Sequence, residues 1–218
     1  MASPAKPDIF FLCLAMQSFL DDSYSALINQ ISAKANIKRA KSASGALNYL
    51  SAHTPRAILA TDEGLTKPSN GPVLEKVLSY VRGGVLLLIG LHFPNFTNMD
   101  VFDKFFEDLG LPWKHGDYHR TTFRFNSGCT LPAGMSRAKF PGPYSMKTLH
   151  VKGARAHEKI FVPVSEAMTQ SMVFPPEYVD QTQAAVVGAK IGEGYLFYDG
   201  NVNPEDGQNK VVLTLCGL

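Results

Sequence analysis

The residue types best suited to chemistry stand directly after apolar runs of strand length. His92 follows the run at residues 85–89 and the turn residues Gly90 and Leu91, and Asp62 and Glu63 follow the run at 57–60. A carboxylate beside an imidazole can form a general acid/base pair, in which the acid orients the ring or keeps it charged. We therefore predict His92 and Glu63 as catalytic candidates. The alternative is that Asp62 caps a turn and His92 only satisfies nearby backbone groups.

Other polar and aromatic residues are predicted to lie at the same edge. In open α/β sheets, ligands bind outside the carboxyl ends of the strands, so residues that follow different strands are brought together there. A pocket at this edge would take small molecules. The residues that we predict to bind a ligand are Gln17, Asp62, Leu91, Phe93, Asp199 and Asn201.

A second cluster has the composition of a metal site. In the segment His115-Gly116-Asp117-Tyr118-His119, the two histidines and the aspartate would share one face of an extended chain, and they are workable ligands for zinc. Gly116 favours a turn instead, and a fourth ligand is not identifiable. A polar loop is therefore the competing interpretation. We predict no cofactor. The one candidate to test is a divalent metal bound by this cluster.

The elements that position these residues alternate in type. The run at residues 85–89 is apolar without interruption, which is typical of a strand buried on both faces of a parallel sheet. A helix is expected to end just before it, at Gly83-Gly84. Strands and helices alternate from residue 9 to residue 109, which predicts a flavodoxin-like, three-layer α/β sandwich with a mainly parallel central sheet.

The second half of the chain has a different pattern. Residues 113–145 are rich in Gly, Pro, Ser and Thr, and they predict an irregular insertion that contains a strand at 121–125. Strands are also expected at 147–152 and 159–164. Residues 184–190 and 194–198 flank a short turn and predict an antiparallel hairpin. We expect residues 1–218 to form a single domain with this antiparallel addition in its C-terminal half.

Composition excludes several classes of protein. The chain has 218 residues, of which 45% are hydrophobic and 18% are charged, and this is typical of a globular protein with a sizeable core. Its formal net charge of +2 is too small to predict a nucleic-acid partner. Neither a signal peptide nor a membrane span is evident, and three widely spaced cysteines form no disulfide framework. We expect a soluble, intracellular protein of the cytoplasm.

Three of these segments together resemble the class I glutamine amidotransferase-like superfamily, especially its ThuA-like branch. They are the Tyr-Val-x-Gly-Gly helix end at residues 80–84, the apolar strand with its Gly90-Leu91-His92 turn, and the Gly-Glu-Gly-Tyr-Leu-Phe-Tyr segment at 192–198. The resemblance implies the α/β sandwich already predicted. By analogy with this architecture, a homodimer is also compatible with the sequence.

The nucleophile of that superfamily is missing. A true glutamine amidotransferase has a cysteine in the sharp turn after the apolar strand, where an exposed thiolate lies beside oxyanion-binding N–H groups. This chain has Leu91-His92-Phe93 there, and Cys13, Cys129 and Cys216 lie elsewhere. Cysteine-dependent glutaminase activity is therefore not expected.

Two hypotheses about function follow. In the first, the chain is a pseudoenzyme, a nucleophile-less amidotransferase-like domain that binds a small metabolite or a protein partner. In the second, it is a ThuA-like hydrolase or carbohydrate-modifying enzyme. That enzyme would use His92 with Glu63 or Asp62, or a metal bound by His115, Asp117 and His119.

Overall fold

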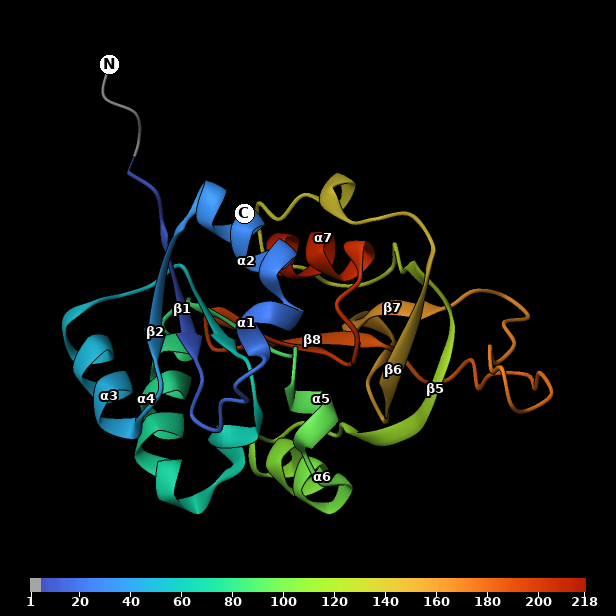
Figure 1. Cartoon of the computed structure of the whole chain (residues 1–218), viewed down its shortest axis with the longest axis horizontal. Coiled ribbons are helices and arrows are strands. Elements are labelled where there is room, and N and C mark those ends of the chain that lie inside the picture. Colours follow the sequence, from blue (N-terminus) through green and yellow to red (C-terminus); the bar gives the residue numbers. More distant parts are fainter. Residues whose placement is uncertain (1–4) are drawn as a thin grey trace.

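A computed structural model describes residues 5–218 and arranges them around one nine-stranded sheet (Figure 1). The strand order is β2-β1-β3-β4-β9-β8-β7-β5-β6. In that order the bounds are Asn36–Ala40, Asp8–Leu12, Ala57–Ala60, Leu86–Ile89, Gly194–Asp199, Val186–Ile191, Lys159–Pro163, Lys114–Phe125 and Tyr144–Lys152. The first five of these strands are parallel, and the last four are joined by antiparallel pairings. The predicted fold class is confirmed.

Helices cover both faces of the parallel half. One apolar core joins the sheet to α3 (Ala43–Ala52), α4 (Gly71–Arg82) and α6 (Met99–Asp108). The other core joins the opposite face to α1 (Leu20–Ser23), α2 (Ser25–Lys34) and α7 (Asp206–Leu215). Figure 1 shows α2 and α7 above the sheet and α3, α4 and α6 below it. Burial on both faces explains why β3 and β4 are apolar throughout, whereas the edge strand β2 contains Asn36, Lys38 and Arg39.

The central strand β4 lies between β3 and β9, and its register is set by the helix before it. Gly83 caps α4, and Gly84 has a φ of +111°, a conformation that glycine adopts without the steric cost of a Cβ. Leu87, Leu88 and Ile89 are completely buried. The short helix α5 (Phe93–Phe96) begins three residues after the strand, which leaves a sharp turn at residues 90–92.

The antiparallel half differs from the sequence expectation in one respect. Residues 113–145 were predicted to be irregular except for a strand at 121–125. That strand is confirmed as the end of the longer β5, which spans 114–125, and the irregular part is confined to 126–143. β5 pairs with both β6 and β7, so cross-strand hydrogen bonds override the weak local strand preference of its Gly and charged residues. The expected 184–198 hairpin is confirmed as β8 and β9.

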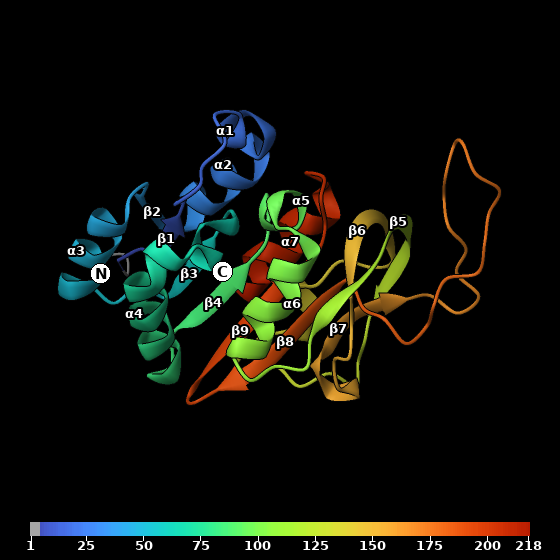
Figure 2. The ribbon, with the colours of Figure 1, turned by 90° about the horizontal axis from the view of Figure 1, so that it is seen from below.

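The β5–β6 ribbon folds back toward the carboxyl end of β9. Thr148 of β6 bridges to Asn201, and Val151 of β6 bridges to Ala184. These bridges occupy the outer edge of β6, so the antiparallel half curls toward a closed ring of strands. The loop between β7 and β8, residues 164–185, leaves this ring and projects from the molecule (Figure 2).

Candidate functional site

The turn after β4 has a strained geometry that places its side chains. Leu91 has a φ of +58°, in the left-handed region that residues other than Gly, Asn and Asp rarely adopt. The His92 N–H donates to the Thr61 carbonyl at 2.9 Å, which ties the turn to the end of β3. A Cβ added to Gly90 would lie 3.3 Å from the Cβ of Asp199, so the ends of β4 and β9 are in contact there. The Leu91 side chain is only 1% exposed.

His92 is enclosed by aromatic rings. Its ring centroid lies 5.0 Å from that of Phe19, 5.3 Å from that of Tyr24 and 5.5 Å from that of Phe96. Only 4% of the residue is exposed. The imidazole therefore lies beneath a lid of side chains, whereas the sequence placed it at the edge of an open pocket. Helix α5 and the loop after β1 bring these rings together, and nothing in the local sequence signals that closure.

The predicted partner Glu63 influences His92 through charge. Burial lowers the pKa of the His92 imidazole, and the Glu63 carboxylate opposes this by raising it. One oxygen of Glu63 lies 3.4 Å from the ammonium of Lys67. The other oxygen of Glu63 and Nδ1 of His92 are buried, and within residues 5–218 neither has a hydrogen-bond partner. The pair is close enough to interact but forms no hydrogen bond in that part of the chain.

Asp62 has the structural role that the alternative interpretation gave it. Its Oδ1 accepts from the backbone N–H groups of Ala15 and Gly64, each at 3.0 Å. Its Oδ2 accepts from the Thr61 hydroxyl at 3.2 Å. Both carboxylate oxygens are thus engaged in capping the short helix at Glu63–Thr66 and in holding the loop after β1.

Asp199 and Asn201, at the end of β9, are completely buried. The Asn201 N–H donates to Oδ1 of Asp199 at 3.1 Å, and Oδ2 of Asp199 has no partner in the part of the chain that the structure describes. Burial without a counterion raises the pKa of Asp199 to about 7. The Asp199 charge also raises the pKa of Tyr24, after the larger effect of burial. Tyr24 therefore contacts the His92 ring and is also close enough to Asp199 to be affected by its charge.

The sequence did not single out several buried polar groups around the end of β9. Tyr144 packs against Gly207, whose added Cβ would lie 2.5 Å from the Tyr144 ring. Buried atoms of Tyr144, Thr148 and Gln208 have no hydrogen-bond partner among residues 5–218. These residues come from β6 and α7, which are distant in sequence, so only the tertiary structure gathers them.

Two other binding candidates have different surroundings. Gln17 is half-buried in the loop before α1, where its carbonyl accepts from the Leu20 N–H at 3.1 Å. Phe93 is completely buried and packs against Phe102 and Tyr198, with ring centroids at 6.2 and 6.1 Å. Phe93 is therefore part of the core and cannot line an open pocket.

Each of the three predicted metal ligands on β5 contacts a different residue. A bulge between His115 and Tyr118 breaks the two-residue alternation that would have put them on one face. Nδ1 of His115 lies 2.9 Å from Oδ1 of Asp103. The Asp117 carboxylate accepts from the Gln183 amide at 3.0 Å, and the ring of His119 packs on that of His150. Within residues 5–218, no three His, Cys, Asp or Glu side chains converge as a metal site.

Three cavities lie away from the turn after β4. Cavities of about 850 and 540 Å³ lie near the amino end of β9, and both include Tyr195 in their walls. A third, of about 630 Å³, lies between the β5–β6 ribbon and the projecting loop. His92 and Glu63 line none of these three.

The surface above His92 is apolar. Phe19 is 45% exposed and Phe96 is 42% exposed. Their ring centroids are 6.3 Å apart, and both rings lie against His92. These two residues form what we call the Phe19 patch.

The cysteines are poorly placed for nucleophilic catalysis. Cys13, Cys129 and Cys216 are all buried, with free thiols. Burial raises the pKa of each, in the case of Cys216 to about 12. The thiols are therefore protonated at neutral pH, and none occupies the turn after β4.

Comparison with known proteins identifies solved structures that have a similar fold. No protein-family model matches the sequence, and no curated protein matches it. Among solved structures, a ThuA-like protein from Parabacteroides merdae ATCC 43184 aligns with a TM-score of 0.57 and 12% identity, over 99% of this chain and 89% of that one. A cytoplasmic protein from Salmonella typhimurium LT2 aligns with a TM-score of 0.50 and 12% identity, over 96% and 95%.

A much larger protein contains the same arrangement. The β-galactosidase from Bacillus circulans sp. alkalophilus aligns with a TM-score of 0.52 and 12% identity, over 98% of this chain. The chain spans 31% of the length of that β-galactosidase. At this identity the likenesses establish the fold alone: a mixed α/β sandwich shared with a ThuA-like protein. In the described residues, no helix is both long and apolar enough to cross a membrane.

Proposed function

We propose that this chain is a nucleophile-less domain of the glutamine amidotransferase-like superfamily, of the ThuA-like kind, that binds a ligand without transforming it. The observation that carries the proposal is Leu91. It occupies the left-handed position after the central strand, with a φ of +58°, and its hydrocarbon side chain is 1% exposed. A residue there that acted as a nucleophile would need a reactive, accessible atom.

The Phe19 patch supports a partner with an apolar surface. Large apolar side chains at neighbouring exposed positions favour interaction sites. Because His92 lies beneath Phe19 and Phe96, a ligand on this surface meets the two rings before it meets the imidazole. Of the two ligand types considered from the sequence, this arrangement favours a protein partner over a small metabolite.

Two assays test this proposal. The wild-type chain is expected to release no ammonia from glutamine, and measurable turnover would refute the nucleophile-less interpretation. A thermal-shift screen of sugars, amides and nucleotides tests the choice of ligand. A small molecule whose stabilising effect is lost in Phe96→Ser would favour a metabolite. Phe174→Ser is the matched control, because Phe174 is 73% exposed on the distant projecting loop.

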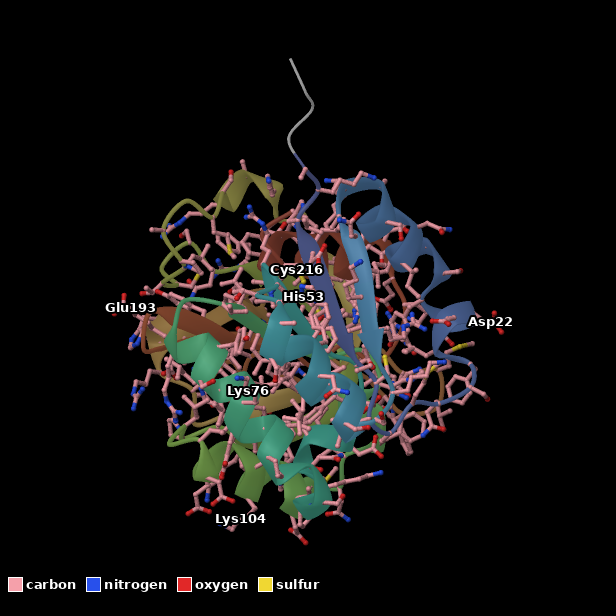
Figure 3. All side chains as sticks on the ribbon, turned by 90° about the vertical axis from the view of Figure 1, so that its left-hand side faces the viewer. Asp22, His53, Lys76, Lys104, Glu193 and Cys216 are labelled. Atoms are coloured by element: carbon pink, nitrogen blue, oxygen red, sulfur yellow. The ribbon has the colours of Figure 1, made fainter. Side chains whose placement is uncertain are left out.

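A hydrolase that uses His92 and Glu63 is the second candidate. The unpartnered Nδ1 of His92 and the unpartnered oxygen of Glu63 favour it, because catalytic groups are often left unsatisfied until substrate binds. Substrate would first have to displace Phe19 and Phe96. Hydrolysis of a nitrophenyl glycoside or ester that is abolished in Glu63→Gln, but not in Glu193→Gln, would establish this function. Glu193 is an exposed acid at the far end of the sheet, labelled in Figure 3.

A further inference from the structure

Two histidines on adjacent strands form a close pair outside the site just described. His119 lies on β5 and His150 on β6, and their ring centroids are 4.4 Å apart. His150 is completely buried and also lies beside Phe123, at 5.2 Å between ring centroids. The sequence offered His119 as a metal ligand together with His115 and Asp117. The tertiary structure pairs it instead with a histidine 31 positions away.

A backbone contact determines which nitrogen of His150 is available. Nδ1 of His150 lies 2.8 Å from the Asp117 carbonyl oxygen, which can only accept a hydrogen bond. Nδ1 therefore carries the proton, and Nε2 of the neutral ring has a free lone pair. A ring N–H donated to a backbone carbonyl is the contact that orients histidine ligands in metal sites.

The remaining nitrogens of the pair are unsatisfied. Nε2 of His150 and Nε2 of His119 are both buried, and neither has a hydrogen-bond partner in the described range 5–218. Burial lowers the pKa of both rings, that of His150 to about 4, so both are neutral at physiological pH. A buried polar atom without a partner destabilises the fold, and here two such atoms lie on rings in contact.

The surrounding charges favour a cation on one side of the pair. The carboxylates of Asp117 and Asp180 both act to raise the pKa of His150. The Gln183 amide nitrogen donates to both carboxylates, at 3.0 and 3.1 Å, which holds them near the ring. Their combined field stabilises positive charge placed beside His150.

The other side of the pair opens to the third cavity. His119 lines the cavity of about 630 Å³ together with Arg120, Lys147 and Glu177. Both cationic side chains are already engaged: Arg120 pairs with Glu205 at 2.7 Å, and the Lys147 ammonium lies 4.8 Å from the Tyr118 ring centroid. A small ion that enters through the cavity would reach His119 first.

We infer that His119 and His150 bind one transition-metal ion through their Nε2 atoms. Imidazole nitrogen suits Zn²⁺ and copper among the first-row metals. Rings whose centroids are 4.4 Å apart cannot provide the linear geometry of a two-coordinate Cu⁺. The geometry therefore favours Zn²⁺, which would take its remaining ligands, such as water, from the cavity side. The site differs from the sequence-predicted cluster, because Asp117 contributes only its carbonyl, as the group that orients His150.

The test is metal titration of the full-length chain without a polyhistidine tag. Zn²⁺ is expected to bind at one ion per chain in competition with a chromophoric chelator. His119→Ala should weaken that binding at least about 100-fold, because loss of even an outer-shell partner costs up to about that factor. The matched control is His53→Ala, since His53 is exposed at the end of α3, on the opposite side of the molecule (Figure 3).

A second variant separates metal binding from folding. His119→Phe keeps an aromatic ring against His150 and should retain the wild-type melting temperature while losing the metal. X-ray absorption of the loaded wild type should show two imidazole ligands. The inference is overturned if Zn²⁺ does not bind stoichiometrically, or if His119→Phe binds it as tightly as the wild type does.

Discussion

Two regions of this molecule hold buried histidines, and they are built in opposite ways. His92 is a single imidazole among aromatic rings, beneath a lid formed by Phe19 and Phe96. His119 and His150 lie diagonally on two adjacent antiparallel strands with their rings in contact, and a backbone carbonyl orients one of them. The comparison shows that an unpartnered nitrogen is not by itself a site. A second donor and a route from solvent decide what the nitrogen can bind.

The largest expected loss of stability is in the histidine pair. His150→Ala removes a completely buried ring from between Phe123 and His119 and leaves a cavity, so we expect the free energy of unfolding to fall by about 3 kcal/mol. Urea denaturation measures this change. A loss below about 1 kcal/mol would mean that the ring is not tightly packed in solution.

A pH-dependent effect is expected at the end of β9. The folded-state pKa of Asp199, about 7, is above the ordinary value of 3.8. The native state therefore binds more protons than the unfolded state between about pH 4 and 7, and Asp199 destabilises the fold as pH rises through that window.

Asp199→Asn should remove this dependence. We expect it to stabilise the chain by about 4 kcal/mol at pH 8 and by little at pH 4, because one pKa unit corresponds to about 1.4 kcal/mol. Chemical denaturation at both pH values is the measurement. Equal effects of the substitution at the two values would show that Asp199 is ionised and paired in the native state.

A smaller effect should distinguish His92 from the pair. His92→Phe replaces a buried, unpartnered polar atom by carbon within an aromatic cluster, so we expect stabilisation of about 1 kcal/mol. The melting temperature should rise accordingly. Destabilisation would indicate that Nδ1 of His92 has a partner in solution, which would bring the two regions closer in character.

The smallest expected effect is at the Phe19 patch. Phe96 is 42% exposed, so Phe96→Ser should change the free energy of unfolding by less than about 1 kcal/mol. A larger loss, measured by urea denaturation, would show that the ring serves mainly to pack His92. The patch would then be structural rather than an interaction surface.

Much of the fold could be predicted from local patterns. The Gly83-Gly84 helix end and the 184–198 hairpin depend on interactions between residues close in sequence. The parallel strands could be predicted because strands buried on both faces have apolar sequences. β5 was only partly recognised, since its segment contains Gly116 and several charged residues. Its pairing with β6 and β7 provides the hydrogen bonds that local propensity did not predict.

The sequence by itself determined that a strand ends in Gly90-Leu91-His92 and that no cysteine stands there, because both facts are matters of residue identity and order. Only the tertiary structure decided that this turn is covered and that His119 meets His150. Those outcomes depend on aromatic side chains that flank α1 and on one from α5. They also depend on the register of β5 and β6, which brings together two histidines 31 residues apart in sequence. Side-chain packing across such separations has no local signature, so no reading of neighbouring residues could have supplied it.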